Sequence, residues 1–375
     1  FVQSVNQLND ANFLNNTLSS SVSYSKTFPK YPRVNVSLTS SLSQNTQTQT
    51  VNLTLPTFQA NMERIFPFAP KTGTKKGFIQ NINFQYSTRG ESRIITTEEF
   101  LFKKEMFEDA RSGITHSIPI STNFKVLKHL SVSTSANYKE VWTPNTVRYN
   151  DYTEEAGVVK DTLKGFAAFR EYNYSASVGT TIYGTFNFRE GKRLQSIRHT
   201  MRPSISYSVQ PNFERYYDEY IIDANGTKAQ YTRFENALFG KPSRGMSKSM
   251  GISLSNNFEA KVASRDSLDP EPKKIKLLNN LNFSTSYNLT ADDFKLAPIR
   301  VTTGASLFKD EVSINLAATM DPYGIDENNA RISTFHVKNG GGLVRFTSAN
   351  MNIGFSLSNG DFEKKEGDEE KEEEE

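Results

Sequence analysis

Many short stretches of this sequence alternate between apolar and small polar residues with a period of two. Between Ser249 and Val262, the apolar residues Met250, Ile252 and Leu254 stand at every second position, separated by glycine and serine. A period of two places the two kinds of side chain on opposite faces of a β-strand. The alternation recurs in residues 34–38, 205–209, 281–289, 312–320 and 351–357. We count about a dozen such segments, each close to the ~9–11 residues of a tilted membrane strand.

The polar positions of these stretches carry small neutral side chains, mainly serine, threonine, asparagine, glutamine and glycine. A sheet face open to bulk water, as in a soluble β-sandwich, usually has more long charged side chains. Small neutral polar residues suit the crowded lumen of a barrel instead. Our candidate lumen-facing residues are Ser253, Asn257, Asn282, Ser284, Ser286 and Asn315.

Charged residues stand mostly between the alternating stretches. Residues 34–62 contain none and lie between Arg33 and Glu63, and residues 277–291 are a second stretch without charge. A charge on the lipid face costs about 2–4 kcal/mol at mid-bilayer and almost nothing at the interface, so a membrane strand keeps its charges at its ends. The sequence therefore predicts an all-β fold: part of an antiparallel transmembrane β-barrel of the outer-membrane type, with long extracellular loops.

The composition agrees with a barrel. Hydrophobic residues make up 36% of the 375 residues, which suffices when only every second strand residue faces lipid. No run of 18 apolar residues exists, so the sequence excludes a helical membrane span. The chain opens with FVQSVNQLND, which lacks the features of a secretory signal peptide. Because an outer-membrane protein needs one, we expect Phe1 not to be the natural start.

The charge distribution suggests how the chain is divided. We expect a barrel segment over residues 1–360 and an acidic disordered tail, or a truncated loop, over residues 361–375. That last stretch, DFEKKEGDEEKEEEE, holds ten acidic residues and three lysines, and such runs are usually solvated. The remaining basic residues are spread over expected loops and strand ends without forming a stripe. They favour membrane lipid phosphate over nucleic acid as an anionic partner.

Polar and charged segments predict the connections between strands. Residues 308–311 predict a tight hairpin, and Gln44–Thr50 predicts a polar turn. Longer insertions predict extracellular loops. These lie at Arg89–Gly113, Glu140–Glu171, Pro211–Lys248, Ala263–Lys276 and Asp321–Gly342.

Three local patterns refine this prediction. Thr96 and Glu99 have the spacing of a capping box, which predicts a short helix in the first long loop. The uncharged run Tyr172–Phe188 predicts the longest strand. Aromatic residues at expected strand ends, Tyr138 and Trp142 among them, suggest a girdle at the membrane boundary.

The sequence offers no catalytic or metal-binding motif. The four histidines (His116, His129, His199 and His336) lack zinc-binding spacings, and cysteine is absent. The glycines at 340–342 lack the Lys-Ser/Thr that follows a phosphate loop. We therefore predict no cofactor, no metal and no enzymatic activity. A barrel-embedded hydrolase is kept as a minor alternative, which would need a convergent Ser/His/acid cluster.

Three stretches carry a likeness to a known family: Ser43–Phe68, Gly113–Trp142 and Ser196–Phe213. They resemble the barrel of the lipopolysaccharide-assembly protein LptD, the organic-solvent-tolerance family, in its Bacteroidetes-type form. The likeness extends loosely over most of residues 1–360. It implies a protein of the Gram-negative outer membrane that transports lipopolysaccharide and inserts it into the outer leaflet.

The resemblance also implies partners. Barrels of this family hold an LptE-like plug lipoprotein in the lumen, receive lipopolysaccharide from periplasmic jelly-roll proteins and release it between their first and last strands. The N-terminal jelly roll and the cysteines of the best-known members are missing from this sequence, so we transfer no individual functional residue. The main alternative is a porin or a TonB-dependent transporter for small solutes. A soluble β-sandwich adhesin is the least favoured.

Overall fold

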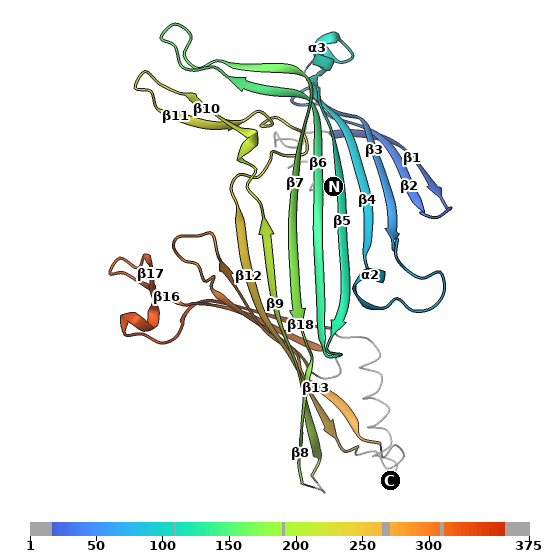
Figure 1. Ribbon diagram of the computed structural model, residues 1–375, viewed down its shortest axis with the longest axis vertical. Coiled ribbons are helices and arrows are strands. Elements are labelled where there is room, and N and C mark those ends of the chain that lie inside the picture. The colour runs from blue at the N-terminus through green and yellow to red at the C-terminus, as the bar shows by residue number, and fades with distance from the viewer. Residues whose placement is uncertain (1–16, 109, 190–191, 265–270, 308–310, 357–375) are drawn as a thin grey trace, which may run out of the picture. The chain divides into compact units, whose positions relative to one another are not determined.

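The computed structural model describes residues 17–108, 110–189, 192–264, 271–307 and 311–356 (Figure 1). These residues form an antiparallel β structure with a few short helices, which confirms the all-β part of the predicted fold class. The chain divides into two compact units. The first comprises Phe1–Phe124, Ser133–Ser175 and Val209–Ser247, and the second comprises Lys125–Val132, Ala176–Ser208 and Lys248–Glu375.

The first unit is built on strands that pair in chain order. They are β1 (Thr17–Phe28), β2 (Val34–Asn45), β3 (Thr50–Ile65), β4 (Asn83–Thr97), β5 (Arg111–Val126), β6 (Leu130–Tyr149) and β7 (Lys160–Gly179). Its connections hold the short helices α2 (Gly77–Gln80), η2 (Glu98–Phe100), α3 (Lys104–Glu108) and η3 (Glu214–Tyr216). A small hairpin of β10 (Tyr217–Ile221) and β11 (Lys228–Thr232) follows η3.

The second unit continues the same construction. Its neighbouring strands are β9 (Leu194–Gln210), β12 (Ser247–Val262), β13 (Lys273–Asn288), β14 (Ile299–Leu307), β15 (Val312–Asp321) and β18 (Arg345–Phe355), with β8 (Ile182–Asn187) paired to β9. Between β15 and β18 lie the hairpin of β16 (Tyr323–Ile325) and β17 (Arg331–Phe335) and the 3-10 turn η4 (His336–Asn339).

The two end strands each keep an open edge. Within the described residues, β1 is hydrogen-bonded to β2 alone and β18 to β15 alone.

The strands predicted from alternation are present. Residues 249–262 lie in β12, residues 312–320 lie in β15, and residues 281–288 form the end of β13. The turn predicted at Gln44–Thr50 is tighter than expected, because Asn45, the last residue of β2, already pairs with Thr50, the first residue of β3. The Asn45 side-chain oxygen accepts hydrogen bonds from the N–H groups of Gln47 and Thr48 at 3.0 and 3.1 Å. An Asx turn of this kind closes a hairpin without glycine or proline.

Two other predictions concern residues that lie partly or wholly outside the described part of the chain. Leu307 pairs with Val312, as the predicted hairpin at 308–311 requires, but residues 308–310 lie outside the described part. The acidic stretch 361–375 lies wholly outside it.

Two predicted loops contain long stretches of strand. Residues 89–97 of the expected loop Arg89–Gly113 extend β4, and most of Glu140–Glu171 belongs to β6 and β7. The prediction was wrong because it took charge as the sign of a loop. In the structure Glu91, whose side chain is 3% exposed, lies between Arg89 and Arg93 at 2.6 and 2.8 Å. Charges paired in this way are compatible with a strand.

The helix in the first loop is present but begins later than expected. The helix α3 starts at Lys104, and Thr97 precedes η2 without a side-chain cap, so the capping box of Thr96 and Glu99 is not formed. Met106 is buried and Phe107 is 56% exposed. One apolar side chain therefore anchors α3.

The predicted position of Tyr138 and Trp142 at a strand end is wrong, and a girdle at the membrane boundary stays a prediction. Both residues lie in the middle of β6, because the strand continues to Tyr149. Their polar atoms contact one carboxylate: Trp142 Nε1 donates to Glu140 at 2.8 Å, and the Tyr138 hydroxyl donates to the same side chain.

The long run Tyr172–Phe188 is interrupted at Thr180 and Thr181, which separate β7 from β8. The neighbouring strand explains the break. The Thr180 N–H donates to the carbonyl of Pro203 at 3.2 Å, and a proline has no N–H to return the bond. Gly179 lies against this point, where an added Cβ would meet Pro203 O and Ser204 Cβ at 3.2 Å.

Replacing Gly179 with alanine is expected to destabilise the fold by about 1–3 kcal/mol, because backbone and a short side chain must give way. Gly184→Ala is the matched control, since nothing lies within 4 Å of its Cβ position. The measurement is urea unfolding of the purified protein in detergent, followed by tryptophan fluorescence. Equal unfolding midpoints for the two variants would contradict the close approach at Gly179.

Candidate functional site

The six predicted lumen-facing residues lie on one face of the second unit. Ser253 pairs with Ser284, and the Gly251–Ser286 and Ser255–Asn282 pairs flank it on the same face. Asn315 joins them through the β14–β15 register, in which it lies opposite Gly304. That this face lines a lumen stays a prediction.

Asn257 lies at the point where the β12–β13 register shifts, between Asn256 and Phe258. Its side-chain oxygen accepts a hydrogen bond from Arg202 at 2.9 Å, and Ser204 bonds to Ser253 at 2.7 Å along the same strand. Asn256 lies on the opposite face, as alternation with Ser255 requires, where it is buried and bonds to His199 at 3.0 Å. Asn257 therefore keeps the orientation of Ser253.

Small polar side chains on this face bond to one another across the strands. Besides the Ser204–Ser253 contact, Ser208 bonds to Ser249 at 2.7 Å and Asn279 donates to Ser306 at 2.8 Å. Such pairs satisfy each other, so most of this face is neutral and polar, with Arg202 and Arg300 as charged residues on it. A face of this kind can hydrate a passing polar group without binding it tightly.

The opposite face is apolar and uncovered. Leu254 pairs with Phe283, and Leu316 with Met351. Phe283 and Met351 are 36% and 64% exposed. Val301 and Ala318 of the same face are buried, so the exposed apolar side chains do not form an unbroken row. Exposed apolar side chains gathered on one face mark a surface that another apolar phase or partner covers.

In the first unit, the segment 211–247 folds over β6 and β7. Its aromatic residues Phe213, Tyr216 and Phe234 form a buried cluster with Val141 of β6 and Phe169 of β7. The Phe169 and Phe234 rings lie 4.9 Å apart. The cluster provides the largest apolar contact of this segment with the strands.

Polar contacts fix the same segment in place. The Arg170 N–H donates to the Tyr216 hydroxyl at 3.0 Å, and the Ser243 N–H donates to Glu171 at 2.7 Å. Lys139 Nζ donates to the carbonyl of Phe239 at 3.3 Å. The segment is therefore an ordered covering layer, which we call the cap (residues 211–247).

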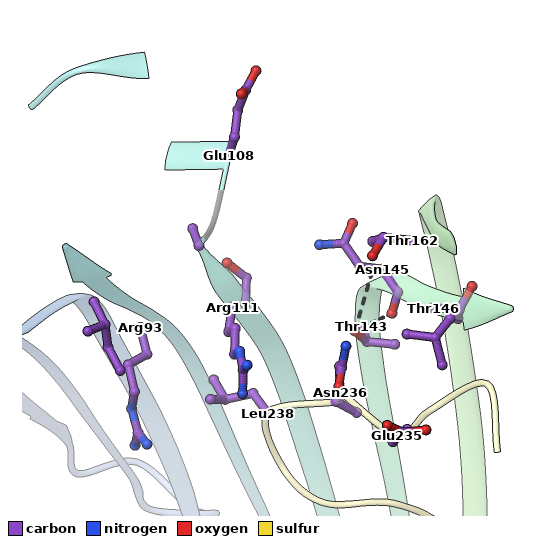
Figure 2. A pocket seen from close by; sticks show the side chains of 15 residues that line it. Arg93, Glu108, Arg111, Thr143, Asn145, Thr146, Thr162, Glu235, Asn236 and Leu238 are labelled. Atoms are coloured by element: carbon purple, nitrogen blue, oxygen red, sulfur yellow. Dashed lines mark hydrogen bonds between the residues drawn. The ribbon is translucent and has the colours of Figure 1, made fainter. Parts of the chain in front are cut away.

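A cavity of about 590 Å³ lies beside the cap, within the first unit (Figure 2). Its basic residues are Arg93 of β4 and Arg111 of β5, and the cap contributes Glu235 and Leu238. Neutral hydrogen-bonding side chains complete much of the lining: Thr143, Asn145, Thr146, Thr162 and Asn236. The arrangement suits a hydrated, anionic group better than an apolar one.

Glu235 carries a charge that is already balanced. Lys160 Nζ lies 2.8 Å from its carboxylate, and the Tyr149 hydroxyl donates to it at 3.2 Å. The hydrogen bond from Lys160 holds the pKa of the Glu235 carboxyl below its ordinary value. The carboxylate is therefore ionised at neutral pH and paired with a lysine.

The sequence did not point to this cavity. Arg93 and Arg111 both fall inside the expected loop Arg89–Gly113, and their neighbourhood depends on the β4–β5 register, which places one opposite the other. Arg93 and Arg111 are 18 positions apart in the sequence, with η2 and α3 between them. No sequence pattern relates two charges at that distance.

A metal site and a helical membrane span find no support among the described residues. There, no group of three or more metal-ligating side chains comes together. No helix among the described residues is long and apolar enough to cross a membrane. His116 contacts Tyr86 and Trp142, and His199 stacks on Phe258, so both serve packing.

Comparison with known proteins identifies one family. A family model described as LptD protein matches residues 1–323 of the chain, well over half of its length. A search of curated proteins gave no match.

Proposed function

Because this chain belongs to the LptD family, whose members transport and assemble lipopolysaccharide, we propose that its strands form part of a barrel wall in the outer membrane. In this proposal the small-polar face lines the path of the lipopolysaccharide head, and the apolar face contacts membrane lipid. The porin and TonB-dependent transporter alternatives are not supported.

One observation carries the proposal: the opposite character of the two sheet faces in the second unit. Ser253 and Ser284 form a pair on one face, and the adjacent pair Leu254 and Phe283 lies on the other. Lipopolysaccharide has an anionic polar head and several acyl chains, so its outward movement needs both environments. Polar hydroxyl and amide groups can replace water around the head, while lipid outside the wall receives the chains.

The protein's action on lipopolysaccharide is physical in this proposal. Its described residues supply hydrogen bonds and shape, and no bond of the lipid is made or broken. We further propose the partners that the family resemblance implies, an LptE-like plug lipoprotein and periplasmic jelly-roll proteins that deliver the lipid.

Depletion of the full-length protein is expected to leave lipopolysaccharide in the inner membrane or periplasm with its covalent structure unchanged. Sensitivity to large hydrophobic antibiotics should rise, because the outer leaflet loses its barrier lipid. The measurement is membrane fractionation with mass spectrometry of the lipopolysaccharide, and re-expression of the wild-type protein is the control. Normal surface lipopolysaccharide together with loss of uptake of one nutrient would replace this proposal with a transporter.

A further inference from the structure

The cavity of Figure 2 has two arginines that face each other on neighbouring strands. Arg93 of β4 lies directly opposite Arg111 of β5 in the antiparallel register. In Figure 2 their side chains run in the same direction from the two strands. Directly opposed residues have Cβ atoms about 4.5–5.5 Å apart, and like charges at that position destabilise a sheet. A counter-charge in the cavity would relieve this repulsion.

The protein supplies only part of that counter-charge. Glu91 Oε1 lies 2.8 Å from Arg93, but its other oxygen lies 2.6 Å from Arg89. One carboxylate therefore serves two guanidinium groups. Arg111 makes no ion pair and no side-chain hydrogen bond with any residue in the described part of the chain. Together these four side chains carry two positive charges in excess.

The two acidic residues that line the cavity do not neutralise Arg111. Glu235 is paired with Lys160 at 2.8 Å. Glu108 is paired with Lys104 at 3.4 Å, and in Figure 2 its side chain points away from the two arginines. The excess charge at Arg93 and Arg111 is therefore available to a ligand.

The remaining lining defines what kind of anion fits. Its volume of about 590 Å³ falls in the range of small-molecule sites, about 300–1,000 Å³, and is far larger than one phosphate ion needs. Threonine hydroxyls and the amides of Asn145 and Asn236 lie in the same cavity. Such groups bond to the hydroxyls of a sugar, and a guanidinium binds a phosphate or carboxylate through two parallel N–H bonds.

We propose that this cavity binds an anionic sugar, with Arg93 and Arg111 holding its phosphate or carboxylate and the asparagines and threonines contacting its hydroxyls. The inference rests on the proposed function, since the polar head of lipopolysaccharide consists of such sugars. In this proposal the first unit holds the polar head of lipopolysaccharide in a binding site beside the cap.

The test is binding of defined sugars to the purified full-length protein in detergent, measured by isothermal titration calorimetry. The probes are glucose 1-phosphate, glucuronate and uncharged glucose. One or both charged probes should bind, and glucose should bind at least tenfold more weakly. Arg111→Gln is expected to weaken binding about tenfold to a hundredfold, because a charge-assisted contact is lost. Arg111→Lys should recover part of the affinity, since it restores charge without the two-pronged geometry.

Arg148→Gln is the matched control, an exposed arginine of β6 outside the cavity lining, and it should bind like the wild type. Preference between the two charged probes identifies phosphate or carboxylate as the recognised group. The proposal is overturned if glucose binds as well as the charged sugars, if inorganic phosphate alone binds as well as glucose 1-phosphate, or if Arg111→Gln leaves binding unchanged. These results concern the cavity alone, because lipopolysaccharide transport is judged separately by depletion.

Discussion

Arginine in place of Leu254 or Phe283 is expected to impair assembly of the protein strongly. The two residues pair across β12 and β13 on the apolar face, which is the lipid face in our proposal. An arginine there costs about 2–4 kcal/mol at mid-bilayer, a large fraction of a typical folding free energy of about 5–15 kcal/mol. The measurement is the fraction of protein in the outer membrane that shows heat-modifiable migration on gels.

Ser253→Arg and Ser284→Arg are the matched controls, because this pair is adjacent in the same two strands and lies on the other face. A long side chain there extends into polar surroundings and not into lipid. Ser253→Arg is the cleaner control of the two, because Arg300 lies opposite Ser284 in the β13–β14 register and would repel a second arginine. The serine variants should therefore assemble much better than the Leu254 and Phe283 variants. Equal damage at both pairs of positions would show that the faces are assigned wrongly.

The sequence was sufficient to predict which residues share a face. Alternation with a period of two is a local property, so the orientation of residues such as Ser253 and Phe283 follows from the strand alone. The register shift between the pairs Asn256–Leu281 and Phe258–Leu278 is the exception. The extra residue in β13 depends on the partner strand and leaves no local pattern.

Strand length was harder to predict, for an electrostatic reason. Glu91, Glu140 and Arg170 look like loop residues when each charge is considered alone. In the structure, Glu91 pairs with two arginines of its own strand and Arg170 lies 3.8 Å from Glu140. The partners of Glu91 stand two residues away on its own strand, so alternation alone places them on its face. The Arg170–Glu140 contact depends on cross-strand register, which the sequence does not contain.

The cap and its cavity lay beyond sequence analysis for the same reason. The segment 211–247 was expected to be a long loop, and it does connect β9 to β12. Its burial of Phe213 and Phe234 against β6 and β7 joins residues that are 44–93 positions apart, counted from Phe169 to Phe213 and from Val141 to Phe234. No periodic signal relates residues at such distances.

Replacing Phe234 with alanine is expected to release the cap from the strands. The ring is fully buried, with 0% exposure, between Phe169 and Tyr216. Loss of a buried phenylalanine ring costs about 3–5 kcal/mol, which exceeds the roughly 0.5–1.5 kcal/mol of a single hydrogen bond such as that from Arg170 to Tyr216. The polar contacts should therefore fail to hold the cap once the aromatic cluster is broken.

The strands themselves should tolerate this change, because their hydrogen-bond ladders do not pass through Phe234. We expect normal heat-modifiable migration but at least a tenfold faster cleavage within 211–247 by added protease. Phe169→Ala, on the strand side of the same contact, should give the same cleavage. Phe166→Ala is the control, since that ring is 74% exposed on the same strand. Protection of the cap in Phe234→Ala equal to that of the wild type would mean that the polar contacts alone hold it.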